Sequence, residues 1–237
     1  GKIELRWVDG DKIDIACPQA AAGRRKAAYQ IVTKSIVADP NSSTIDNGKA
    51  TQLDKLGEYG IQWGEPGNHD FYALYPSSKS FTDSERGEIG IDRTGVNGYL
   101  PVNQDPKGVT EVKVTEDEKT KINYILEPDM RYAFMVAQNS VDSRVVGATG
   151  VSLQFEPLVT ALQFELTAPK IINNTTESAE LTITAVSLNT VNEQNICGSF
   201  QYKFEGNAIT DKNEESGFNR ITQTIPASKP VILHADN

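Results

Sequence analysis

Apolar and polar side chains alternate along several short runs of the chain, as in β-strands that bury one face. Residues 13–17, 162–166 and 200–204 show this alternation most clearly. A helical spacing of apolar positions is almost absent, and the two weak helix candidates, residues 19–28 and 52–59, are equally compatible with loops. The pattern therefore predicts a protein built from short strands.

Turn-forming residues separate these runs. In the strongest hairpin candidate, residues 147–150 form the turn between a strand that ends at Val146 and one that begins at Val151. Short strands with frequent turns predict an all-β fold, an antiparallel β-sandwich with long loops. The long loops are polar and cover residues 38–52, 77–98 and 205–220.

The length of the chain fits one large domain over residues 1–237. The strand patterns give this domain a core over about residues 1–204, and residues 205–237 form an extension. Gly1 in place of a Met is typical of the remnant of a removed tag, so we expect the natural chain to extend upstream. No run of about 18 apolar residues predicts a transmembrane helix.

Charge and composition narrow the range of functions. The chain has 32 acidic and 23 basic residues, and its formal net charge of -9 disfavours nucleic acid and anionic lipid as partners. It has only two histidines and two cysteines, so it offers few groups for metal, acid–base or thiol chemistry. Cys17 and Cys197 lack the C-x-x-C spacing of zinc and redox sites. The sequence leaves open whether they form a disulfide or remain two buried thiols.

The sequence lacks the motifs of common catalytic sites. His69 and Asp70 are adjacent, but no G-x-S-x-G elbow supplies a nucleophile and no G-x-x-x-x-G-K-[ST] loop would hold a phosphate. The aromatic run at residues 71–76 predicts a strand with His69 as a polar residue at its edge. Residues 211–217 resemble a calcium loop but lack its required glycine, and the carboxylates of residues 9–14 fit a turn. We therefore expect no enzyme and no catalytic, cofactor-binding or metal site.

Five motifs follow one another over about residues 7–204. They are W-x-x-G-D-x-I at residues 7–13, an aromatic strand ending in Tyr-Pro at 71–76, L-P-x-x-Q at 100–104, a stretch similar to Asp-Leu-Met-x-Ala at 129–135, and V-x-L-x-F followed by L-x-F at 151–164. Each motif alone is an ordinary strand pattern, but in this order they resemble the fimbrillin family of the Bacteroidetes. The sequence departs from the family at Pro157, where the family often has His.

This resemblance implies a pilin-type surface protein with transthyretin-like β-sandwich domains, exported as an outer-membrane lipoprotein. In polymerising members of the family, an Arg-specific protease removes an N-terminal strand, and a strand of another subunit fills the groove. Arg6 and Arg25 are the candidate processing sites here. The implied partners are other pilin subunits and host or bacterial surface ligands. We also expect the second domain of the family to be missing, and an open or differently filled sheet edge near the N-terminus.

A glycan-binding protein of an outer-membrane polysaccharide-uptake system is the alternative. Trp63 lies among glycines, and Tyr72 and Tyr75 follow on the next predicted strand, so the three rings could form a platform for sugars. In a sandwich, the same aromatic residues also serve to fill the core, because each ring buries a large apolar area. The sequence leaves both roles open.

Overall fold

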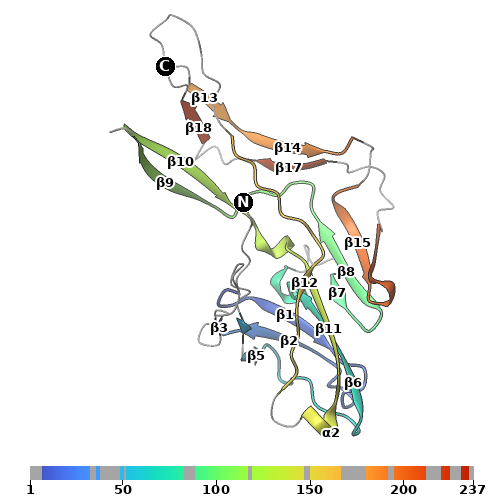
Figure 1. Cartoon of the computed structure of the whole chain (residues 1–237). Helices are drawn as coiled ribbons and strands as arrows, with labels where there is room; N and C mark the ends of the chain where they lie inside the picture. Colours follow the sequence, from blue (N-terminus) through green and yellow to red (C-terminus); the bar gives the residue numbers. More distant parts are fainter. Residues whose placement is uncertain are drawn as a thin grey trace, which may run out of the picture. The chain divides into compact units, whose positions relative to one another are not determined.

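The structure is a computed structural model, and it describes residues 7–32, 36–37, 49–50, 52–82, 89–116, 119–146, 150–166, 180–191, 195–211, 220–224 and 231–234. Regular structure in these residues is almost entirely antiparallel β-sheet (Figure 1). The helices described are α2 (Ser143–Val146) and three single 3₁₀ turns at Ser78–Ser80, Met130–Tyr132 and Glu205–Asn207. Among the described residues, no helix is both long and apolar enough to cross a membrane. The all-β prediction is confirmed.

Contacts within the chain define two compact units, each made of separate segments. The first contains Gly1–Tyr99, Arg131–Ala161 and Ser199–Lys212, and the second contains Leu100–Met130, Leu162–Gly198 and Asn213–Asn237. Residue 204 is not a boundary between these units, since it lies inside a segment of the first. The single domain over residues 1–237 stays a prediction.

A six-stranded antiparallel sheet forms the centre of the first unit. Figure 1 shows β6 between β1 and β11, and the register pairs Ala73 with both Ile15 and Ala137. The strand predicted over residues 13–17 is confirmed as β1. In spatial order the strands are β12 (Glu156–Pro157), β11 (Met135–Asp142), β6 (Asn68–Tyr75), β1 (Lys12–Ala16), β2 (Lys26–Ile31) and β5 (Leu53–Lys55).

One face of this sheet carries a compact apolar core, which follows directly from the alternation of side chains along each strand. Its buried members come mainly from β1 and β6, and half-buried side chains from flanking loops and strands cover them. The buried residues are Ile13, Ile15, Cys17, Ala20, Phe71, Ala73, Tyr75 and Ala137, and the covering residues include Trp7, Tyr29, Ile61, Val151, Leu153 and Phe155.

The other face packs against a four-stranded sheet, so the two sheets form the predicted sandwich. The Tyr72 ring of β6 lies 4.7 Å from the Phe204 ring, and Phe134 lies 5.3 Å from Phe200. The strand pattern over residues 200–204 is thus confirmed as buried strand β15 and its end. The order of this sheet is β16 (Ala208–Asp211), β15 (Gly198–Lys203), β8 (Gly95–Leu100) and β7 (Gly90–Ile91).

The second unit has a different construction, because its described strands form two-stranded ribbons. The longest ribbon pairs nine residues of each strand in register. One more ribbon, of β3 (Ile36–Val37) with β4 (Lys49–Ala50), lies in the first unit. The ribbons of the second unit are β9 (Gly108–Glu116) with β10 (Lys119–Glu127), β13 (Glu180–Ile183) with β18 (Val231–His234), and β14 (Ala185–Asn189) with β17 (Arg220–Thr224).

Three local predictions were wrong. Val145 and Val146 belong to helix α2 rather than a strand, and the Val145 side chain is exposed. Residues 150–155 return alongside β11 without forming a strand, although β12 then pairs with β11. Residues 162–166 are part of no strand, despite their alternation. The alternation of apolar and polar side chains therefore identified amphipathic segments, but it did not predict which of them pair with a strand in a sheet.

Candidate functional site

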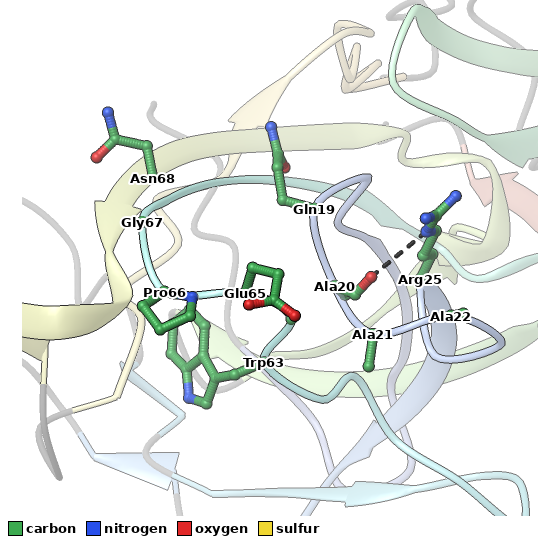
Figure 2. Close-up of a pocket in the computed structure, with 11 residues that line it drawn as sticks. Gln19, Ala20, Ala21, Ala22, Arg25, Trp63, Glu65, Pro66, Gly67 and Asn68 are labelled. Carbon is green, nitrogen blue, oxygen red and sulfur yellow. Dashed lines mark hydrogen bonds between the residues drawn. The ribbon is translucent and has the colours of Figure 1, made fainter.

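An open groove of about 640 Å³ lies in the first unit, between the turn that joins β1 to β2 and the segment that leads into β6 (Figure 2). Residues 19–22 and Arg25 line it from the turn, and residues 63–68 line it from the segment. We call it the Trp63 groove. Its volume lies within the range of small-molecule sites, about 300–1,000 Å³.

Close backbone contact fixes the two walls of the Trp63 groove to each other. The amide of Ala21 donates to the carbonyl oxygen of Gln62 at 3.0 Å. A Cβ atom on Gly64 would lie only 2.1 Å from the carbonyl oxygen of Gln19. Since backbone cannot yield as easily as the end of a side chain, glycine at position 64 is required for this approach.

His69 clamps the segment that carries Trp63. Its ring is 1% exposed, and its Nε2 atom accepts a hydrogen bond from the Gly64 amide at 3.2 Å. The proton of the neutral ring therefore lies on Nδ1, which donates to the Gly67 carbonyl oxygen at 2.9 Å. Ser143 holds the other side of the same residue, since Gly67 N donates to its Oγ at 3.0 Å. His69 is thus a buried structural residue, and as the second residue of β6 it lies near the end of the predicted strand.

Trp63 provides the aromatic surface of the groove. Its ring makes edge contacts with the rings of His69 at 4.9 Å and Phe71 at 5.6 Å. The residue nevertheless stays 44% exposed, although it is anchored against buried neighbours. Figure 2 shows Trp63, Glu65 and Pro66 on one side of the groove and Ala20, Ala21 and Arg25 on the other.

Polar side chains surround this aromatic surface. Gln19 is fixed by Asp70, because its Nε2 donates to Oδ2 at 2.7 Å and its Oε1 accepts from the Asp70 amide at 3.0 Å. Arg25 donates from Nε to the carbonyl oxygen of Ala20 at 3.4 Å. This bond does not use the donors on its two terminal nitrogens. Glu65 and Asn68 complete the rim with exposed side chains.

The three aromatic residues of the predicted glycan platform are not brought together. Tyr75 is 5% exposed and packs on Trp7 at 5.4 Å, on the same face of the sheet as Phe71. Tyr72 lies on the opposite face against Phe204, where burial, followed by the charge of Asp70, raises the pKa of its hydroxyl. An odd spacing of three residues within one strand already implies opposite faces. Only Trp63 of the three lines the groove.

Sequence reasoning missed the polar companions of Trp63. Gln19 and Arg25 lie some forty positions before it, and only the fold brings them near. The one local signal was the run of glycines at Gly60, Gly64 and Gly67, of which Gly64 marks a close backbone contact.

The two cysteines are both buried and neither forms a disulfide in the structure. Burial raises the pKa of the Cys17 thiol above its usual range, and Cys17 Sγ lies 3.9 Å from Gln19 Oε1 as a weak donor. Cys17 belongs to the first unit and Cys197 to the second, so both alternatives stay predictions.

Of the two candidate processing sites, only Arg25 lies among the described residues. Arg6 lies outside the described residues. Arg25 has an exposed side chain, but its carbonyl oxygen accepts from the Cys17 amide at 2.8 Å and closes the turn between β1 and β2. A protease would need this turn to open before it could cut there.

Carboxylates near the N-terminus serve the fold. Asp14 is 2% exposed and accepts from the Ser77 hydroxyl at 2.6 Å and the Ser78 amide at 2.9 Å. Asp11 accepts from the Val8 amide at 2.8 Å and from the Tyr75 hydroxyl at 3.2 Å. Among the described residues, no group of three or more His, Cys, Asp or Glu side chains is placed to hold a metal ion. Most of the calcium-like stretch at 211–217 lies outside them.

A second feature of interest is the segment of residues 162–166, which we call the 162–166 segment. Its apolar side chains, Leu162, Phe164 and Leu166, are 58%, 51% and 43% exposed. Its backbone enters no strand pairing in the described part of the chain. An alternating apolar face that stays in water is available to a partner.

Comparisons with known proteins give a partial similarity. The chain is 31% identical to human (Homo sapiens) ephrin-B1 over 129 residues, and the match covers 47% of this chain and 37% of ephrin-B1. Mouse (Mus musculus) ephrin-B1 matches with the same identity and coverage. The matched region thus spans well under half the length of either relative. No protein-family profile and no solved structure matches the chain.

Proposed function

We propose that this protein is a non-enzymatic fimbrial subunit or accessory adhesin of a bacterial surface. It would be exported as an outer-membrane lipoprotein, assemble by donation of a β-strand between copies, and mediate adhesion of the cell. The fimbrillin-like order of motifs suggests this role, and the exposed apolar face of the 162–166 segment carries it. The proposal does not depend on the partial similarity to ephrin-B1.

The exposed apolar side chains of the 162–166 segment are unfavourable in water. Leu162, Phe164 and Leu166 occupy alternate positions and stay about half exposed. Pairing with a strand of another subunit would bury these side chains at about 25 cal/mol per Å² of apolar surface. It would also supply partners for the backbone amides and carbonyls along the segment.

The ribbons of the second unit support the same mode of assembly. Within the described pairing, each of these ribbons contains only two strands. An isolated two-stranded hairpin is marginally stable in water, and a third strand stabilises it. Strand addition from a second copy would therefore stabilise this unit as well as join the copies.

Cleavage after Arg25 would create a place for such a strand. β1 lies between β2 and β6 and is connected to β2 through the turn that Arg25 closes. A cut in this turn makes β1 exchangeable, and its departure leaves a gap that is flanked by strands on both sides. A donated strand that fills this gap would restore two ladders of hydrogen bonds.

Assembly of the full-length protein tests this function. The protein is treated with an Arg-specific protease, and oligomers are measured over a range of concentrations by analytical ultracentrifugation and electron microscopy. We expect concentration-dependent polymers, and Phe164→Asp should lower the amount of polymer at least tenfold. The matched control is Gln163→Asp, which adds the same charge on the polar face and should leave assembly intact. The proposal would be overturned if the trimmed protein stayed monomeric at every concentration. It would also be overturned if Phe164→Asp formed as much polymer as the wild type.

The alternative function, glycan binding in a polysaccharide-uptake system, is favoured by one observation, the exposed Trp63 in a polar groove. Binding of a glycan is compatible with both an uptake protein and an adhesin. The assembly experiment separates the two functions, because an uptake protein does not need to polymerise.

A further inference from the structure

We propose that the Trp63 groove binds a neutral saccharide, with one sugar ring stacked against Trp63. This inference goes beyond the strand-mediated assembly above and gives the alternative function, glycan binding, a defined site. Cleavage after Arg25 and departure of β1 would remove the wall that residues 19–25 form, so saccharide binding is measured on the uncleaved chain. The 162–166 segment lies outside the groove, so binding by the uncleaved chain and assembly of the trimmed protein can fail separately.

The aromatic surface provides the first argument. Trp63 is 44% exposed although His69 and Phe71 hold it at fixed distances of 4.9 and 5.6 Å. A large ring that is anchored but not covered offers apolar contact area with little loss of side-chain entropy on binding. The C–H groups on one face of a pyranose ring match such a surface in size and polarity.

The polar rim provides the second argument, because sugar hydroxyl groups both donate and accept hydrogen bonds. Gln19 keeps one Nε2 hydrogen after its bond to Asp70, and Arg25 keeps its terminal nitrogens after its bond to Ala20. Glu65 and Asn68 add a carboxylate and an amide. The same groove that holds the aromatic ring is thus lined by hydrogen-bond donors and acceptors.

The charge of the rim selects a neutral ligand. Arg25 and Glu65 contribute one positive and one negative charge, and Asp70 beside Gln19 adds a second negative charge. In a chain with a net charge of -9, an anion such as a phosphate gains nothing from this rim. A fully apolar ligand would cover the rim groups and leave them without hydrogen bonds, which is costly.

Preorganisation provides the last argument. The Ala21–Gln62 backbone bond and the close approach of Gly64 to Gln19 fix the two walls before any ligand arrives. The His69 ring then fixes the peptides of Gly64 and Gly67. A ligand therefore binds without ordering a loop, so even a few hydrogen bonds and one stacking contact can produce measurable affinity.

The experiment uses the full-length protein and a panel of neutral oligosaccharides: maltotetraose, cellotetraose, mannotetraose, galactobiose and chitotetraose. Binding is measured by isothermal titration calorimetry and by NMR, and inorganic phosphate serves as the anionic probe. We expect at least one oligosaccharide to bind with a Kd of about 1 mM or tighter, and phosphate not to bind at that concentration.

Variants locate the binding site. Trp63→Ala should weaken binding at least tenfold and Asn68→Ala about threefold, and Trp63→Phe should retain part of the affinity because a ring remains. The matched control is Tyr99→Ala, which removes an aromatic ring that is 40% exposed on β8 and does not line the groove. This variant should bind as the wild type does.

Several outcomes would overturn the proposal. They are no binding by any oligosaccharide of the panel, binding that survives Trp63→Ala, or phosphate binding that exceeds saccharide binding. Thermal melting of each variant establishes that it is folded, and Trp63→Phe remains informative if Trp63→Ala is destabilised. Retained saccharide binding by Phe164→Asp would separate this site from strand-mediated assembly.

Discussion

Residues 151–155 and the 162–166 segment have nearly the same sequence pattern and very different surroundings. The first carries Val151, Leu153 and Phe155 at alternate positions, and all three are half-buried against the apolar core of the first unit. The second carries Leu162, Phe164 and Leu166 at alternate positions, and all three are exposed. Neither stretch is a strand in the structure.

The difference lies in what each stretch is attached to. Residues 150–155 follow β11 and helix α2, and the Asn139 side chain donates to the Ser152 carbonyl oxygen at 2.7 Å. β12 then pairs with β11, so the chain is held along the core face at both ends. The 162–166 segment has no such connection among the described residues. The alternation of apolar and polar residues therefore identifies a face that can be buried. Whether it is buried depends on how the flanking segments are attached to the sheet.

Stability measurements on matched variants are the strongest way to test this comparison. Phe155→Ala removes a ring that lies 5.3 Å from Trp7 over the core, and it should destabilise the protein by about 2–3 kcal/mol. Phe164→Ala truncates the same type of side chain at a position exposed to water, and it should change the free energy of unfolding by less than about 0.5 kcal/mol. Urea denaturation of the monomeric full-length protein measures both. Equal losses for the two variants would show that Phe164 is also part of a core.

The side-chain bond from Asn139 is expected to have a smaller effect. Asn139→Ala removes the bond that ties residues 150–155 to β11, and the expected loss is about 1 kcal/mol because the bond is exposed to water. The control, Gln163→Ala on the exposed segment, should have no measurable effect. Hydrogen exchange of the amides of residues 150–155 should become faster in Asn139→Ala only. Unchanged exchange in that variant would show that apolar contact alone holds the stretch.

The ion pair between Asp142 and Arg144 should have the smallest effect on stability. It lies where β11 leads into α2, and the side-chain hydrogen bond from Arg144 lowers the pKa of Asp142 to about 2. Because this pKa is below the usual value of about 3.9, the stabilising contribution is complete above pH 4 and is lost as the pH falls toward 2.

NMR titration of the Asp142 carboxyl group checks this prediction. In Arg144→Gln the midpoint should rise toward the ordinary value for aspartate, with little change in stability at pH 7 because the pair is exposed. Asp9, which has no basic residue within two positions in the sequence, is the control. A midpoint that stays near 2 in Arg144→Gln would show that another group determines the pKa.

The sequence predicted those parts of the fold that depend on local pattern. β1 and β15 are where the alternation placed them, and the aromatic run at residues 71–76 supplies most of β6. These strands were predictable because each buries side chains at the period of two. The helix at Val145 and the unpaired state of residues 162–166 were not predictable, since both depend on how the connecting chain is routed.

The candidate site was predictable only in part. Trp63 stood out because an aromatic residue among glycines is uncommon in a strand core. Gln19, Arg25 and Asn68 could not be assigned to it, because the groove forms when two loops dock through Gly64. The proposal that Tyr72 and Tyr75 join Trp63 neglected the strand geometry, which sends them to opposite faces.

The clamp formed by His69 also makes this residue a spectroscopic reporter. The chain has only two histidines, so their ring resonances are simple to assign, and His69 lies 4.9 Å from the ring of Trp63. The Nδ1–H tautomer has distinct nitrogen chemical shifts, and the ring current of Trp63 displaces its carbon-bound protons. Any movement of the indole, whether by a ligand or by loosening of the loop, would therefore be visible at an unlabelled native side chain. His69 is therefore the natural probe of this loop.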